Sequence, residues 1–224
     1  MPGDPAGLPR QRRGITPQMH GRYPDYEVLE NRDHWDEVTR RVVMARVDDV
    51  SPIRFFTPAE ARTLGAFCDC VTAQDAEPRI PLINFVDDKF YNGRLDGFQH
   101  AGMPPDPDVW RRMAAILDER ARDQYGAASF DQCSLAAQHN VCIEFAESKL
   151  DTGDMDCSTA WSVMMRATLS AFYSHPWAWN EIGFGGPAYP RGYSRLGPGM
   201  REEWEGHEAF ELDPVKDTES RALE

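Results

Sequence analysis

Hydrophobic residues recur along most of the chain at the spacing of one face of an α-helix. The clearest start signal is Thr57-Pro58-Ala59-Glu60, where Thr57 can accept a hydrogen bond from the backbone of Glu60 and Glu60 can reach back. Pro58 fits the first helical turn. A helix is therefore predicted from this point to a stop before residues 75–78. Its apolar stripe consists of Ala61, Leu64, Phe67, Cys68 and Val71.

Five further segments show the same periodicity, over residues 33–49, 81–92, 106–122, 129–149 and 158–172. Their expected start residues are Asp33, Pro81, Asp106, Ser129 with Gln132, and Ser158. Their apolar stripes are Trp35, Val38, Val42 and Val47; Ile83, Val86 and Phe90; Val109, Met113, Ile116 and Leu117; Leu135, Val141, Cys142 and Phe145; and Trp161, Met164, Met165, Leu169 and Phe172. No alternating run indicates a strand, so an all-α fold of about five to six helices is predicted.

The two ends of the chain lack this periodicity. Residues 1–33 are rich in Pro, Gly and charge, which predicts an arm that is disordered or laid over a surface, with Ile15, Met19, Tyr23 and Tyr26 as apolar anchors. After Tyr193 the chain becomes a Pro-, Gly- and acid-rich tail. The expected organisation is an N-terminal arm with one helix over residues 1–50, and a helical domain over residues 51–224 with a long irregular C-terminal segment.

Residues 171–193, AFYSHPWAWNEIGFGGPAYPRGY, combine glycines and prolines with many aromatic side chains. Gly and Pro disfavour a regular element over most of this stretch, so a loop over residues 174–196 is expected. Large apolar rings in a loop must be covered by the rest of the chain or by another protein. The rings concerned belong to Trp177, Trp179, Phe184, Tyr189 and Tyr193.

The formal net charge of −13 disfavours nucleic acid and anionic membrane surfaces as partners. No run of 18 apolar residues is present, so a membrane-spanning helix is not expected. Five cysteines, an odd number without a closely spaced scaffold, indicate reduced thiols and a cytoplasmic protein.

Signals for catalysis are few. The chain has no G-x-S-x-G motif, and its six histidines never occur at the i, i+3 or i, i+4 spacing that binds a metal on one helix face. Gly183, Gly185 and Gly186 follow a helical pattern and precede prolines, whereas a dinucleotide fingerprint lies between a strand and a helix. No catalytic residue, metal site or bound cofactor is predicted in this chain.

Three segments together resemble the gluconate 2-dehydrogenase subunit 3 family. They are FFTPAEARTLGAFCDCV, IPLINFVDDKF and FYSHPWAWNEIGFGGPAYPRGY, and the resemblance covers roughly residues 51–196. The last segment is the most specific. It contains His175-Pro176-x-x-Trp179, then Gly183, Gly186-Pro187 and Arg191-Gly192-Tyr193 in the order and spacing typical of that family.

This resemblance implies a non-catalytic small subunit that binds an FAD-dependent flavoprotein of the glucose-methanol-choline (GMC) type, acting on sugars, sugar acids or polyols. FAD would belong to the partner. Small subunits of exported members often carry a twin-arginine signal, but Arg12-Arg13 here lacks the apolar stretch that such a signal needs. The residues expected at the partner interface are Tyr23, Tyr26, His175, Trp177, Trp179, Asn180, Phe184, Tyr189, Arg191 and Tyr193.

Two alternatives stay open at this point. One is a stand-alone enzyme or sugar-binding protein with a pocket lined by His175, Asn180, Glu181 and Arg191. The other is an assembly chaperone that leaves the flavoprotein after flavin insertion.

Overall fold

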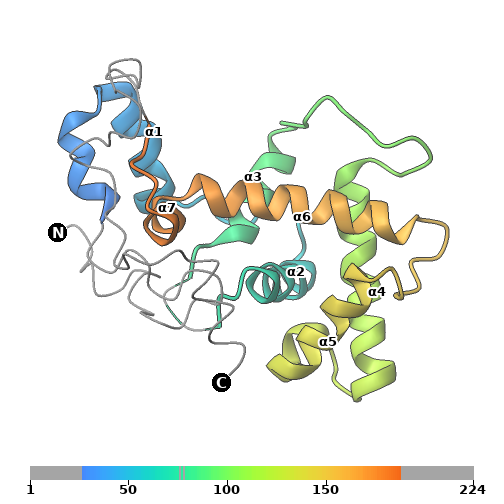
Figure 1. Ribbon diagram of the computed structural model, residues 1–224. Coiled ribbons are helices and arrows are strands. Elements are labelled where there is room, and N and C mark those ends of the chain that lie inside the picture. The colour runs from blue at the N-terminus through green and yellow to red at the C-terminus, as the bar shows by residue number, and fades with distance from the viewer. Residues whose placement is uncertain (1–26, 76, 78, 188–224) are drawn as a thin grey trace, which may run out of the picture. The chain divides into compact units, whose positions relative to one another are not determined.

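Helices make up the secondary structure of the part of the chain that the structure describes, and the prediction of an all-α fold is confirmed. The computed structural model describes residues 27–75, 77 and 79–187 (Figure 1). Within these residues, no helix is both long and apolar enough to cross a membrane. The chain divides into two units, of which one comprises residues 49–173 and the other includes residues 27–48 and 174–187.

The larger unit is built around α2 (Pro58–Val71), which contacts α3 (Leu82–Tyr91), α4 (Asp106–Tyr125), the short 3-10 helix η4 (Phe130–Gln132) and α5 (Leu135–Ala146). The long helix α6 (Cys157–Ser174) also belongs here, except for its last residue. The buried core is rich in large side chains, which include Leu64, Phe67, Trp110, Met113, Leu117, Phe130, Phe145 and Met164.

The start of α2 follows its predicted chemistry. The Thr57 side chain accepts from the backbone N–H of Glu60, and the Glu60 carboxylate accepts from the backbone N–H of Thr57, so the capping box is complete. The segment before this helix is fixed by Asp87 of α3. This fully buried carboxylate accepts hydrogen bonds from the backbone N–H groups of residues 54, 55 and 56 at 2.8–2.9 Å.

Three predicted caps are displaced by a few residues. Helix α1 (Glu37–Asp48) is capped by Asp36 rather than Asp33, α5 by Ser134 rather than Ser129, and α6 by Asp156 rather than Ser158. In each case the side chain nearer the first turn accepts from the backbone N–H three residues later, which is the geometry that an N-cap requires. The 3-10 helix η4 occupies residues that the sequence pattern had joined to the following helix, whereas most of η3 (Val28–His34) lies in the stretch that was predicted to be an irregular arm.

The smaller unit combines η3 and α1 with α7 (Pro176–Ile182). Its core consists of Val28, Trp35, Val43 and Trp179, with Leu29 packed against them. Val43 is the buried valine of α1, whereas Val38 and Val42 of the predicted stripe are exposed. Helix α7 corrects the expectation of an irregular loop from residue 174, because Pro176 stands in the first helical turn and Gly183 ends the helix, where both residues favour helix boundaries.

Candidate functional site

Residues 172–193, the most specific of the three segments that carry the resemblance, are called the family-like segment. His175 anchors the part of this segment that belongs to the smaller unit. It is the N-cap of α7, and its Nδ1 atom accepts from the backbone N–H of Trp177 at 3.2 Å. The ring also makes a hydrogen bond to the backbone of Arg46 in α1. Burial lowers the pKa of His175 to about 4, so the ring is neutral at physiological pH and holds α7 against α1.

Arg46 adds a second connection between the same two helices. Its guanidinium donates to the backbone carbonyl of Ser174 at 2.6 Å and lies 5.9 Å from the centre of the Trp179 ring. Burial lowers the pKa of Arg46 below its ordinary value. The end of α6 and the start of α7 are therefore tied to α1.

Asn180 ties α7 to the start of η3. Its side-chain oxygen accepts from the backbone N–H of Val28 at 2.8 Å, and its amide nitrogen donates to the Glu27 carboxylate at 3.0 Å. The same carboxylate oxygen of Glu27 accepts from the backbone N–H of Leu29 and so caps η3. Asn180 is completely buried and Glu27 nearly so, so these hydrogen bonds form a buried polar network.

Two glycines of the segment, Gly183 and Gly186, also stabilise the fold. Gly183 has a φ of 66°, and its left-handed conformation ends α7. Gly186 has a φ of 79°, and a Cβ atom there would lie 3.1 Å from the Trp35 ring and 3.2 Å from the Val28 side chain. The segment thus closes over the core of its own unit.

The predicted interface residues of this segment differ in accessibility. His175, Trp179 and Asn180 are buried within the unit, Trp177 is half-buried, and Phe184 is 40% exposed with its ring 5.4 Å from that of Trp179. Glu181 of the alternative sugar pocket is also buried. The remaining predicted interface residues lie outside the described part of the chain: Tyr23, Tyr26, Tyr189, Arg191 and Tyr193. Among the described rings of this segment, Trp179 therefore belongs to the core, and Phe184 is the ring that remains most available to a partner.

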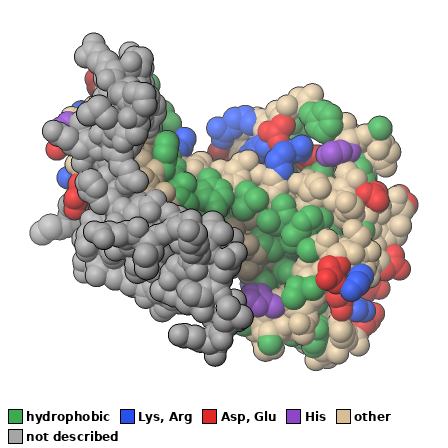
Figure 2. Space-filling model, in the orientation of Figure 1, with side chains coloured by type: hydrophobic (Ala, Val, Ile, Leu, Met, Phe, Trp, Pro, Cys, Tyr) green, Lys and Arg blue, Asp and Glu red, His purple; other side chains and the backbone are tan. Residues whose placement is uncertain are grey.

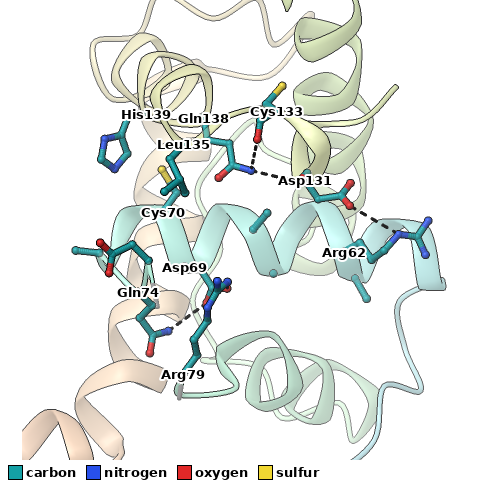
Figure 3. Close-up of a pocket in the computed structure, with 15 residues that line it drawn as sticks. Arg62, Asp69, Cys70, Gln74, Arg79, Asp131, Cys133, Leu135, Gln138 and His139 are labelled. Carbon is teal, nitrogen blue, oxygen red and sulfur yellow. Dashed lines mark hydrogen bonds and ion pairs between the residues drawn. The ribbon is translucent and has the colours of Figure 1, made fainter. Parts of the chain in front are cut away.

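A cavity of about 500 Å³ lies in the larger unit, along α2, η4 and the start of α5 (Figure 3). Figure 3 shows Arg62 and Asp131 at one end, Cys70, Leu135 and His139 toward the other, and Asp69, Gln74 and Arg79 along one side. Small residues of α2 form its floor. The complete lining is Ala61, Arg62, Gly65, Ala66, Asp69, Cys70, Ala73, Gln74, Asp75, Arg79, Asp131, Cys133, Leu135, Gln138 and His139. We call this cavity the α2–α5 groove.

Charged groups at the edges of the groove are paired within the chain. Arg79 donates to Asp69 at 2.6 Å, and Arg62 lies 3.9 Å from Asp131. Partial burial raises the pKa of Asp69 despite this bond, and the bond to Asp69 raises the pKa of Arg79. Gln138 donates to the backbone carbonyl of Phe130 at 3.1 Å and so holds η4 beside α5.

Two thiols, Cys70 and Cys133, line the groove, and two buried thiols lie behind it. The Cys142 thiol donates a hydrogen bond to Cys70, which lowers the pKa of Cys70 and raises that of Cys142. Burial raises the pKa of Cys68 to about 12. Across the described residues, no three His, Cys, Asp or Glu side chains are grouped in a way that could hold a metal ion.

One face of α5 beside the groove is apolar and exposed. Leu135 is 56% and Ile143 53% exposed, and His139 stands exposed between them. Leu135 had been assigned to the buried stripe, which is wrong, since Ala137, Val141 and Phe145 form the buried side. The signal was present in the sequence: LAAQHNVCIEFA is apolar around most of its circumference and carries a single charged residue, Glu144. We call Leu135, His139 and Ile143 the α5 face.

Figure 2 shows that hydrophobic side chains also gather where α6 and α2 lie in Figure 1. The exposed hydrophobic residues of α6 include Leu169 and Tyr173. The larger unit therefore exposes hydrophobic side chains on α6 as well as on α5. Contiguous apolar surface of this kind marks sites of protein interaction.

Comparison with known families gives one result. A family model described as gluconate 2-dehydrogenase subunit 3 matches residues 58–186, which is more than half of the chain. The match begins at Pro58, the first residue of α2, and ends at Gly186, the glycine packed against Trp35. No curated protein and no solved structure matches the chain. On the strength of the family match, the chain belongs to the gluconate 2-dehydrogenase subunit 3 family.

Proposed function

We propose that this protein is a non-catalytic small subunit that binds and stabilises an FAD-dependent oxidoreductase of the GMC type. The substrate class of the complex would be sugars, sugar acids or polyols, and FAD would be held by the larger subunit. The family name supports the first part of this proposal, because it denotes one subunit of a dehydrogenase that has several. The nature of the partner rests on the resemblance described for the sequence.

The observation that carries the proposal is the exposed apolar surface of the larger unit. Leu135 and Ile143 expose more than half of their surface on one helix, and the α2–α5 groove lies beside them. Exposing such residues costs free energy in water, and a partner that covered them would recover it at about 25 cal/mol for each Å² buried. Such a surface is therefore suited to be the interface of a subunit that functions in a complex.

The polar residues of the family-like segment support a structural rather than a chemical role. His175 caps a helix, and Asn180 is fully engaged in hydrogen bonds to residues 27 and 28. Burial keeps both away from solvent. In this proposal the segment builds the smaller unit, and the complex forms in the cytoplasm, where the five free cysteines would stay reduced.

The experiment is co-expression of this chain, carrying an affinity tag, with a GMC-type flavoprotein of the same organism, sought first among the neighbouring genes. We expect the two proteins to purify together in a fixed ratio, with the absorbance spectrum of bound FAD. A related flavoprotein from an unrelated gene cluster is the control. A tagged chain that stays monomeric and elutes without flavin would overturn the proposal. The assembly-chaperone alternative would be favoured if the flavoprotein needs this chain for flavin loading but its mature, flavin-loaded form no longer contains the chain.

A further inference from the structure

We propose that the α2–α5 groove and the α5 face together bind one amphipathic helix of the partner flavoprotein, with basic residues flanking its apolar stripe. This inference rests on the proposed function and adds the surface and the chemistry of the segment that it receives. Three features of the described residues carry it: an exposed apolar ridge, a floor of small side chains, and a rim with more carboxylates than guanidinium groups.

The ridge is formed by residues at helical spacing. Leu135, His139 and Ile143 follow each other four positions apart, so their side chains stand in one row along α5. Rows of this kind pack into the grooves of a second helix. A helix placed beside α5 would cover Leu135 and Ile143 at the same time.

The floor lets a helix approach closely. Ala61 and Ala66 of α2 and Ala73 just after it line the groove, and none of them projects beyond Cβ. An incoming apolar side chain would find room between this floor and Leu135, which Figure 3 shows standing beside Cys70. Because the described residues form no β-strand, they offer no sheet edge for strand addition, and helix-in-groove binding is the mode that this surface suits.

The rim sets the charge of the partner segment. Three carboxylates, of Asp69, Asp75 and Asp131, line the groove against two guanidinium groups, and the exposed Glu77 lies 3.3 Å from Arg79. The whole chain carries a formal charge of −13. Lysine or arginine residues beside the apolar stripe of the incoming helix would therefore be attracted, and an acidic helix repelled.

Two other exposed rings of the same unit contact side chains of the chain itself. The Arg54 guanidinium lies 4.1 Å from the centre of the Tyr91 ring, and Phe98 stacks edge-on against His100 at 4.9 Å. Leu135, by contrast, lines an open groove, and the exposed Ile143 continues the same row along α5. Because of this difference, we infer that the partner helix binds at α5.

The first test substitutes the α5 face. In the co-expression experiment, Leu135→Glu and Ile143→Glu should each lower the amount of co-purified flavoprotein by roughly tenfold or more, as expected for central apolar contacts. Val42→Glu, on the exposed surface of α1, is the matched control and should leave the yield unchanged. Circular dichroism and thermal melting of each variant alone establish that it folds.

Several outcomes would count against the inference. If the unsubstituted chain fails to bind the flavoprotein, the proposed function fails and the inference falls with it. If it binds, and the α5 variants bind equally well or the Val42→Glu variant loses as much, the proposed function survives and the site does not. If sedimentation shows a dimer of this chain alone that Ile143→Glu dissociates, the face belongs to a second copy instead.

A second test leaves the apolar residues intact and uses thiols as probes. Cys70 and Cys133 line the groove, whereas Cys157 lies near Phe145, outside the lining. Binding of the flavoprotein should protect Cys70 and Cys133 from alkylation by a maleimide and leave the rate at Cys157 unchanged. Equal rates at the groove thiols in the free chain and in the complex would overturn the inference even if the complex is stable.

Charge provides a third readout. Asp75→Lys reverses one exposed carboxylate of the rim and should weaken binding several-fold, with a smaller effect at high salt because exposed charges are then screened. Asp33→Lys, at an exposed carboxylate of the smaller unit, is the control. Tighter binding of the Asp75→Lys variant would show that the partner segment is acidic and would contradict the proposed charge.

Discussion

The side-chain oxygen of Asn180 accepts a hydrogen bond from the backbone N–H of Val28 at 2.8 Å, across a separation of 152 positions in the sequence. The Asn180 amide nitrogen also donates to Glu27, so one side chain satisfies groups on two consecutive residues. An amide suits this position because it offers an acceptor and a donor at once. One residue therefore contributes two of the hydrogen bonds that join the two distant parts of the smaller unit.

Replacing Asn180 should destabilise the smaller unit. Asn180→Ala leaves the buried N–H of Val28 without its acceptor, and we expect a loss of about 1–3 kcal/mol in the free energy of unfolding. Asn180→Asp keeps an acceptor but places a second carboxylate against Glu27, so its loss should grow as pH rises and both acids ionise. Urea unfolding followed by circular dichroism measures both variants. Glu30→Ala, at an exposed position of η3, is the control and should change stability little.

Adding a methyl group at Gly186 should lower the free energy of unfolding for two separate reasons. The backbone has a φ of 79°, and the added Cβ would lie 3.1 Å from the rigid Trp35 ring. We expect Gly186→Ala to lower the free energy of unfolding by about 2–4 kcal/mol, the sum of backbone strain and crowding. Gly153→Ala isolates the first term, because Gly153 has a φ of 64° and open space around its Cβ position. Equal losses in the two variants would show that the contact with Trp35 does not matter.

The contrast between Thr57 and the α2–α5 groove shows where reading the sequence succeeds. The capping box at Thr57 depends on residues three positions apart, so local chemistry was enough to place the start of α2. The all-α class followed from the same kind of local periodicity. The groove instead needs Cys70 of α2 beside Leu135 at the start of α5, and no local pattern predicts the side on which two helices leave a gap.

The helix at Pro176 was missed for a related reason. Its proline and glycine were counted against regular structure, although a proline in the first turn and a glycine after the last one define a short helix. The burial of Trp179 likewise depends on Val28 and Trp35, which lie far away in sequence. The family-like pattern was recognised correctly, but Trp179, Gly183 and Gly186 within it serve the fold.

Protonation of His175 should make the stability of the smaller unit depend on pH. Burial lowers its pKa to about 4 in the folded protein, against about 6.5 for an exposed imidazole, so the unfolded chain binds a proton more readily between these values. The stabilisation that depends on neutral His175 is therefore fully present above about pH 6.5. It is lost as pH falls toward 4, which lowers the free energy of unfolding by up to about 3 kcal/mol.

The variant His175→Asn tests this dependence. Asparagine can still cap α7, but it does not titrate, so the slope of the unfolding free energy between pH 4 and pH 6.5 should decrease by the contribution of one proton. The exposed His34→Asn is the control. An unchanged slope in the His175→Asn variant would mean that other groups control the acid sensitivity.

Cys70 should be the most reactive thiol of the described residues. The Cys142 S–H donates to it and lowers its pKa, whereas burial raises the pKa of Cys68 to about 12 and also raises that of Cys157. Iodoacetamide at neutral pH, with peptide mapping over time, should therefore modify Cys70 before Cys157, while Cys68 stays unmodified in the folded protein. Cys142→Ala removes the donor and should slow the reaction at Cys70, whereas Cys142→Ser retains a donor and should slow it less. If the two variants react at the same rate as the unsubstituted chain, the hydrogen bond does not activate Cys70.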